Sequence, residues 1–400
     1  MTRICWSCRR SDRDGRRQIN SVEGKLLRLV LLLVLAQGRL PALSAQSEDA
    51  STARAGNTIA VNQVTNKIYT GNQTLPYVTV IDGASNKSTN IAIKGIPGPI
   101  VVNPVTNKIY VGIYGGRSIA VIDGATNETT TVPVGASAYQ LAVNPVTDKV
   151  YVANYYGGKV TTIDGLTNRT VALRAGLNPV SVAVNSVTNK VYLANWESAE
   201  ATILDASTNH TTNVGIAGKS EVHSIAVNSA TDKIYVASNA QSMNVTEIDG
   251  VTNQTRTIAT AGYVFDLAVN AVTNKVYAAN GYIGAVTAIE GATGKVTKIA
   301  VGRYPTSIAV NPVTNKVYVA NSELCGGVTV IDGGTGRLAR IKAGTELASI
   351  AMNPVTNKIY AYDPEAVSVI DGATNKTTEV SLPIPAGMPR YAQHCDSYRP

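Results

Sequence analysis

Apolar and polar residues alternate with a period of two along most of the chain, and the alternation comes in short runs. Within residues 141–165 and the stretch that follows, Val143 lies in the first run, residues 150–153 form the second, residues 160–163 the third and residues 169–174 the fourth. Alternation with a period of two is typical of half-buried β-strands rather than helices. This stretch therefore predicts four short strands.

The same stretch recurs at a nearly constant interval. A tyrosine in a K-V-Y or K-I-Y triplet marks each copy, and the successive gaps are 41, 41, 41, 43, 42, 41 and 42 residues. The markers are Tyr69, Tyr110, Tyr151, Tyr192, Tyr235, Tyr277, Tyr318 and Tyr360. Four strands in about 42 residues are typical of one β-propeller blade. We therefore predict an all-β propeller of eight four-stranded blades, with a seven-bladed ring as the alternative.

Two turns in each copy use a restricted set of residues. The fifth position of the turn N-P-V-T-N-K is always Asn or Asp, and the last position of I-D-G-A-T-N is always Asn or Gly. These residues tolerate a positive φ, so we expect a left-handed backbone at both positions. The carboxylate of I-D-G recurs in every copy, which predicts a turn-forming role rather than a catalytic one. The first strand carries a small Ala in seven copies, which favours a place beside the crowded ring axis.

These units resemble the YVTN-type β-propeller repeat of bacterial and archaeal surface-layer and exported proteins. The sequence Y-V-A-N at residues 151–154 and 318–321 stands where the family motif stands, and the flanking A-V-N-P-V-T-N-K and V-I-D-G-A-T-N match as well. The resemblance covers residues 56–386. It implies the propeller fold, and it leaves function open because the family includes structural, adhesive and ligand-binding members.

The residues before the repeats predict an export signal over residues 1–45. A basic stretch reaches Arg28, and the apolar run 29–36 is shorter than the ~20 residues that span a membrane. Small residues follow, and we expect cleavage after Ser44 or Ala45. Residues 46–55 are then a flexible lead-in, 56–386 the propeller and 387–400 a C-terminal tail. We expect an exported protein, periplasmic, cell-surface or secreted, with no stable membrane span after cleavage.

Charge and cysteine content narrow the choice of partners. The formal net charge is +8, and residues 1–44 hold nine Lys or Arg and three Asp or Glu, so the remainder carries about +2. A nucleic-acid-binding surface is therefore not expected. Cys325 and Cys395 are the cysteines left after signal cleavage, and an oxidising compartment favours a disulfide between them, with two free thiols as the alternative. We expect a monomer.

The loops divide into two classes. Turns after strands one and three are nearly identical in every copy and define a constant face, whereas loops after strands two and four differ and define a variable face. Loops on a rigid scaffold commonly carry binding residues, although they also drift where nothing constrains them. The predicted ligand-binding residues on the variable face are Arg117, Tyr139, Tyr155, Trp196, Glu221, His223, Tyr263, Arg303 and Tyr304. Tyr156, Phe265, Tyr282 and Glu323 lie in the same loops.

The function that these features predict is binding. We expect an exported interaction scaffold that holds a glycan, peptide or protein of the envelope or extracellular space. The alternatives are a hydrolase-like or lactonase-like enzyme with a metal in the central channel, and a structural envelope component. Only one acid, Asp266, stands near the start of the eight inner strands, whereas a channel metal needs several converging ligands. With no C-x-x-C-H or G-x-S-x-G motif, we expect no catalytic residue, metal or cofactor.

Overall fold

The computed structural model describes residues 59–383 apart from residue 73 and the segments 218–221, 240–242 and 324–325. Internal contacts divide the chain into residues 1–43 and 44–400, and every described residue belongs to the second unit. The predicted export segment, the lead-in, the C-terminal tail, Glu221, Cys325 and Cys395 lie outside the described residues. No helix in the described part is long and apolar enough to cross a membrane.

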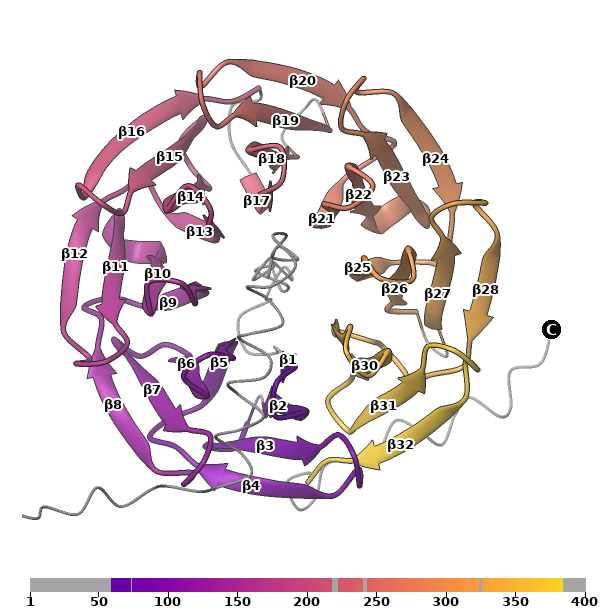
Figure 1. The fold of residues 1–400 in the computed structure, drawn as a ribbon, viewed down its shortest axis with the longest axis horizontal. Coiled ribbons are helices and arrows are strands. Elements are labelled where there is room, and N and C mark those ends of the chain that lie inside the picture. The colour runs from indigo at the N-terminus through magenta and orange to yellow at the C-terminus, as the bar shows by residue number, and fades with distance from the viewer. Residues whose placement is uncertain (1–58, 73, 218–221, 240–242, 324–325, 384–400) are drawn as a thin grey trace, which may run out of the picture. The chain divides into compact units, whose positions relative to one another are not determined.

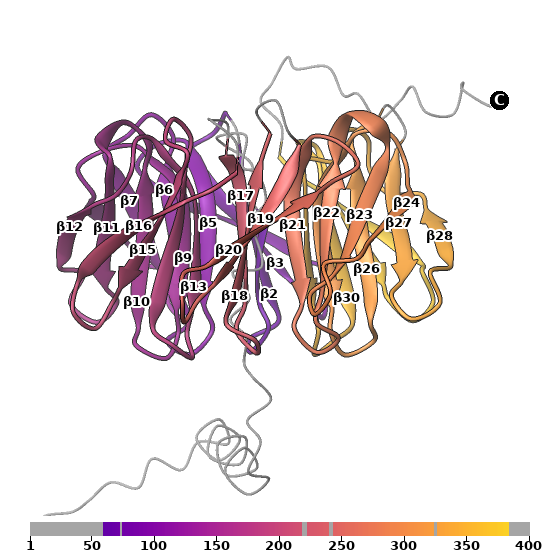
Figure 2. The ribbon, with the colours of Figure 1, turned by 90° about the horizontal axis from the view of Figure 1, so that it is seen from above.

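Eight four-stranded antiparallel sheets stand as blades around a common axis (Figure 1). Each sheet is built from four consecutive strands, with the first strand nearest the axis and the fourth at the outer edge. Viewed edge-on, the strands run between two faces that carry the connecting loops (Figure 2). The prediction of an all-β, eight-bladed propeller is confirmed, and the seven-bladed alternative is wrong.

The inner strands are β1 (Ile59–Asn62), β5 (Pro97–Asn103), β9 (Ala138–Asn144), β13 (Pro179–Asn185), β17 (Val222–Asn228), β21 (Val264–Asn270), β25 (Pro305–Asn311) and β29 (Ser349–Asn353). The second strands are β2 (Lys67–Gly71), β6 (Lys108–Ile113), β10 (Lys149–Asn154), β14 (Lys190–Asn195), β18 (Lys233–Ser238), β22 (Lys275–Asn280), β26 (Lys316–Asn321) and β30 (Lys358–Tyr362). The third strands are β3 (Tyr77–Asp82), β7 (Ser118–Asp123), β11 (Lys159–Asp164), β15 (Glu200–Asp205), β19 (Asn244–Asp249), β23 (Ala285–Glu290), β27 (Gly327–Asp332) and β31 (Ala366–Asp371). The outer strands are β4 (Ser88–Ala92), β8 (Thr129–Pro133), β12 (Thr170–Arg174), β16 (His210–Gly215), β20 (Thr255–Ala259), β24 (Val296–Ala300), β28 (Leu338–Ile341) and β32 (Thr377–Ser381). Two single-turn 3-10 helices, η1 (Tyr155–Gly157) and η2 (Gly281–Ile283), follow β10 and β22.

The repeated turns have the predicted backbone geometry. The Asn or Asp of the first turn has φ between 50° and 54° in all eight copies. The last residue of the second turn has φ between 57° and 63° where it is Asn, and 73° and 72° at Gly294 and Gly336. In the second turn, Asp123 Oδ1 accepts hydrogen bonds from the backbone N–H groups of Ala125 and Thr126 at 2.8 and 3.0 Å. These bonds, that of Thr126 foremost, lower the pKa of Asp123, as expected for a turn-forming carboxylate.

The hydrophobic core lies between neighbouring blades. One cluster joins Ala142 and Tyr151 of the third blade to Val182 and Leu193 of the fourth, and similar clusters span other junctions. The eight repeat tyrosines are at most 1% exposed, which confirms that they pack between blades. Burying an aromatic ring removes a large apolar area from water, so these side chains are a main source of stability.

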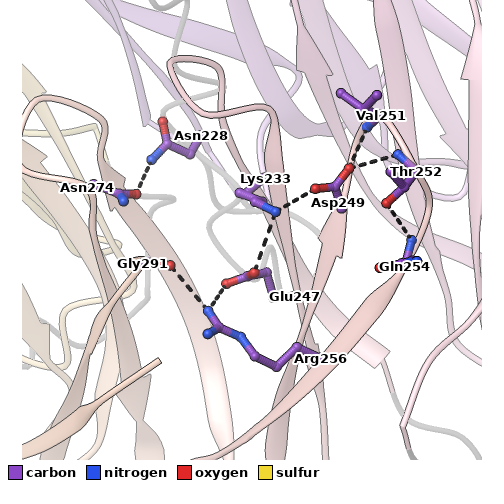
Figure 3. A network of polar contacts seen from close by, with 10 residues as sticks. All are labelled: Asn228, Lys233, Glu247, Asp249, Val251, Thr252, Gln254, Arg256, Asn274 and Gly291. Carbon is purple, nitrogen blue, oxygen red and sulfur yellow. Dashed lines mark hydrogen bonds and ion pairs between the residues drawn. The ribbon is translucent and has the colours of Figure 1, made fainter. Parts of the chain in front are cut away.

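A ring of asparagine side chains holds the blades together on the constant face. The last residue of each inner strand is a fully buried Asn, and its Nδ2 donates to Oδ1 of the first-turn Asn or Asp in the next blade at 2.6–3.0 Å. Figure 3 shows one of these bonds, from Asn228 to Asn274. Buried amides need such partners, so this contact explains why the constant face hardly varies.

The same contacts close the ring between the eighth and first blades. Asn353 Nδ2 donates to Asn66 Oδ1 at 3.0 Å, and the Tyr362 hydroxyl donates to the Gly71 carbonyl at 3.0 Å. Ile59 and Tyr360 belong to a shared apolar cluster at this junction. Among the described residues no strand is exchanged between these two blades, and these side-chain contacts join them.

Candidate functional site

Aromatic rings gather on the variable face of the fourth to sixth blades. Trp196 follows β14, His223 lies in β17, Tyr263 directly precedes β21, Phe265 lies in β21, and Tyr282 lies in η2. We call these five residues the aromatic cluster. Neighbouring rings are edge-to-face, with centroids 4.5–5.4 Å apart. Such geometry is attractive and makes the cluster one continuous surface.

One glycine makes this packing feasible. A Cβ built on Gly281 would lie 1.7 Å from Cε2 of Phe265, so no other residue fits there without moving the ring. In the third blade, Tyr155 of η1 occupies the position of Gly281, and Tyr139 occupies the position of Phe265. The two 3-10 loops therefore present different ring arrangements on the same backbone scaffold.

A hydrogen bond between two ring residues fixes the middle of the cluster. The Tyr263 hydroxyl and His223 Nε2 are hydrogen bonded. Burial lowers the pKa of His223 from 6.5 to about 4, so its imidazole is neutral at neutral pH. The cluster therefore offers an uncharged aromatic surface, and the Tyr282 ring at its edge is 65% exposed.

A second set of rings covers the variable face of the third blade. Tyr139 and Tyr155 are stacked with centroids 5.2 Å apart, and Tyr156 meets Tyr155 edge-to-face at 4.7 Å. We call these three residues the tyrosine cluster. Tyr156 is 81% exposed, and Tyr114 of the second blade is 57% exposed. Burial raises the pKa of Tyr139 most, followed by the neighbouring Tyr155 and then Tyr114, which places Tyr114 close to this cluster. The sequence prediction missed Tyr114, although Tyr114-Gly-Gly occupies the same loop as the tyrosines of η1.

Three further predicted residues that the structure describes join neither cluster. Arg303 Nε lies 3.9 Å from Glu323 Oε2, an exposed ion pair of the kind that contributes little to stability. Tyr304 has a φ of 48° and a half-exposed side chain, and no ring contact includes it in the described part of the chain. Arg117 is exposed on the second blade. Of the eight predicted residues that the structure describes, Arg117, Arg303 and Tyr304 therefore lie apart from the two clusters, which contain the other five.

The acid near the channel is a structural group. Asp266 is fully buried, its Oδ2 accepts from Ile308 N at 3.0 Å and Ser307 Oγ at 3.2 Å, and its Oδ1 accepts from Leu267 N at 2.8 Å. Burial raises the pKa of Asp266 well above its ordinary value, and these hydrogen bonds oppose that shift. Across the described residues, no three His, Cys, Asp or Glu side chains converge as a metal site.

Comparisons with known proteins show the fold. No family model and no curated protein matches the chain. It is similar to the dihydro-heme d1 dehydrogenase NirN in complex with DHE, at 13% identity and a TM-score of 0.65 over 89% of this chain and 84% of that chain. It is also similar to hydrazine synthase from Kuenenia stuttgartiensis, at 17% identity and a TM-score of 0.53 over 81% of this chain and 94% of that chain. A third similar structure is a chain of the mitotic checkpoint complex, at 13% identity and a TM-score of 0.58 over 68% of this chain and 85% of that chain. At such low identity these likenesses concern architecture alone, and the chain is a β-propeller.

Proposed function

We propose that this chain is an exported β-propeller that binds an envelope or extracellular ligand on its variable face. The observation that carries the proposal is the aromatic cluster, in which five rings from three blades form one partly exposed surface. Aromatic residues grouped at a surface are typical of binding sites, since they bury a large area and lose little conformational entropy.

The chemistry of the cluster favours a neutral glycan over a charged peptide or protein segment. His223 is uncharged at neutral pH, and the rings of Trp196 and Tyr282 offer flat apolar faces with a hydrogen-bonding edge. A sugar ring has the complementary pattern, with a C–H face and a rim of hydroxyl groups. The tyrosine cluster on the third blade offers a second surface of the same kind.

Export is part of the proposal. The basic leader, the apolar run 29–36 and the small residues at Ser44 and Ala45 support it, as does the resemblance to YVTN-type surface-layer and exported propellers. N-terminal sequencing of the mature protein recovered from the periplasm or medium tests it. The expected new N-terminus is Ala45 or Gln46, and an uncleaved chain retained in the cytoplasm contradicts it.

Binding is tested with a glycan and cell-wall screen on the wild type and on the Trp196→Ala/Tyr282→Ala variant. Removing two rings of the surface should weaken binding by at least about tenfold, since central aromatic residues commonly contribute ~2 kcal/mol or more. The control is Leu166→Ser, an exposed residue of the constant face, which should bind like the wild type with a similar melting temperature. Full binding by the double variant contradicts the site, and no binding by the wild type favours a purely structural role.

A further inference from the structure

A groove between the sixth and seventh blades is hollow. Its volume is about 190 Å³, compared with a share of ~30 Å³ for each water molecule in the liquid, so it can hold a group of several heavy atoms. One wall is formed by Tyr277, Ala288 and Thr297, which lie side by side in register on β22, β23 and β24. The other wall is the turn at residues 332–336 of the seventh blade.

The chain itself fills the equivalent groove between the fifth and sixth blades. There the corresponding row is Tyr235, Glu247 and Arg256, again in register across three strands. Arg256 Nη2 lies 2.5 Å from Glu247 Oε2 and donates to the Gly291 carbonyl of the sixth blade at 3.2 Å (Figure 3). At this junction the guanidinium group of Arg256 therefore occupies the space between the side-chain row of the fifth blade and the second turn of the sixth blade.

Each of the two grooves is faced by a glycine at the end of the second turn of the next blade, and the missing side chain leaves space for a guest group. The last residue of the second turn is Asn in six copies and glycine only at Gly294 and Gly336. A Cβ on Gly294 would lie 3.0 Å from Nη1 of Arg256, so this glycine makes space for the guanidinium. A Cβ on Gly336 would meet nothing within 4 Å. The same space exists at the second junction, where Ala288 and Thr297 are too short to fill it.

The lip of the hollow groove is acidic. Glu290 stands where the other seven copies have Asp, and the longer carboxylate accepts from Thr293 Oγ1 at 3.1 Å. Within the described residues no ion pair includes Glu290. Asp332 adds a second carboxylate, and Lys275 Nζ donates to the Gly333 carbonyl at 3.0 Å. Two acids and one base therefore favour a cationic guest.

The wall of the groove adds a hydrogen-bonding group. Tyr277 lines the cavity, its side chain is 1% exposed, and its hydroxyl, like those of the other seven repeat tyrosines, has no hydrogen-bond partner among the described residues. The hydroxyl is therefore an acceptor that every blade offers, and it does not by itself distinguish this groove. Ala288, Glu290 and Gly336 depart from the common residues of the repeat, and all three line the same cavity.

We propose that this groove binds a guanidinium group, namely an arginine side chain presented by a partner peptide. A guanidinium has five donors in a planar fork, which suits a carboxylate and a neighbouring backbone carbonyl, and Arg256 shows how this fold accommodates one. The site is formed in part by a constant-face turn, so the inference is independent of the glycan-binding proposal for the variable face.

The test is a titration of the wild-type protein with N-acetyl-arginine methylamide, followed by NMR or calorimetry, with N-acetyl-lysine methylamide as the comparison ligand. We expect saturable binding of the arginine compound at millimolar concentration and at least about threefold weaker binding of the lysine compound. Gly336→Asn and Glu290→Asp each restore the residue of the other copies, so both variants should fold. Each should weaken binding of the arginine compound at least about tenfold.

Two further measurements make the test specific. Glu323→Asp, the same change on the variable face, should leave arginine binding unchanged. Arg256→Thr opens the neighbouring groove with Glu247 still present, so methylguanidinium should raise the melting temperature of that variant more than methylammonium does. The proposal is overturned if the wild type shows no saturable binding, if Gly336→Asn binds like the wild type, or if the lysine compound binds equally well.

Discussion

His223 is held neutral by its surroundings in the aromatic cluster. It packs against Trp196 and Tyr263, whose rings lie 4.5 and 5.1 Å away, and it shares a hydrogen bond with the Tyr263 hydroxyl. A lone histidine near an inner strand was not distinguishable from a surface residue in the sequence, because nothing there shows which rings cover it. The structure makes it the polar centre of the candidate site.

The lowered pKa of His223 predicts a loss of stability in acid. The unfolded chain binds the proton near pH 6.5 and the folded chain only near pH 4, so the free energy of unfolding falls as the pH drops through this range. The full shift corresponds to at most ~3 kcal/mol. Urea unfolding of the wild type and of His223→Gln at pH 7.5 and 4.5 measures it. The wild type should lose more stability than the variant, and equal losses would show that His223 does not titrate in this way.

The cross-strand row Tyr235, Glu247 and Arg256 is the clearest departure from the repeat within one blade. Glu247 is 8% exposed and stands where blades one, two and eight have Val, while Arg256 stands where those blades have Thr. In six other copies the equivalent lysine donates from Nζ to a backbone carbonyl of the next blade. Lys233 Nζ instead pairs with Asp249 of its own blade at 2.6 Å (Figure 3). The buried Glu247 is thus accompanied by altered contacts of Lys233 and Arg256.

Replacing Arg256 alone should lower the free energy of unfolding more than replacing Arg256 and Glu247 together. Arg256→Thr leaves the carboxylate of Glu247 largely buried, with Lys233 at 4.0 Å as its remaining ion-pair partner among the described residues. This predicts a loss of ~1–3 kcal/mol in the free energy of unfolding. The double variant Glu247→Val/Arg256→Thr recreates the apolar row of the other blades and should lie within ~1 kcal/mol of the wild type. Chemical denaturation of both variants measures the difference. If the double variant is less stable than Arg256→Thr, the pair has a role that burial and pairing do not explain.

Features that every blade repeats could be predicted from the sequence, whereas features of single loops could not. Blade number, strand order and the positive φ of Asn66 or Asn86 follow from a period and from residue types that few backbones accept. For the candidate site, the sequence predicts the face and residues on it but not which rings meet, since packing such as that of Phe265 against Gly281 depends on how one loop folds over its own blade. Glu247 was overlooked, although aligning the eight third strands would have shown one acid in an apolar position.

At the scale of the whole ring, stability depends on eight similar junctions of which one differs in connectivity. Seven junctions join blades that are consecutive in the chain. The eighth joins the last blade to the first and, within the described residues, holds through side chains such as Asn353 and Tyr362 and through a shared apolar cluster. A short covalent connection keeps separated blades at a high effective concentration, so the eighth junction should be the first to open.

The substitutions Asn353→Ala and Asn144→Ala test this difference with matched chemistry. Each removes an amide that donates to the next blade, to Asn66 at 3.0 Å or to Asn189 at 2.9 Å, and that accepts from its own turn. Each should lower the free energy of unfolding by a similar ~1–3 kcal/mol. Native-state hydrogen exchange should separate them, because Asn353→Ala should speed exchange throughout blades one and eight, while Asn144→Ala should affect only its own turn. Equal and local effects from both variants would contradict the expectation that the eighth junction opens first, since the missing covalent connection would then make no difference to the opening of that junction.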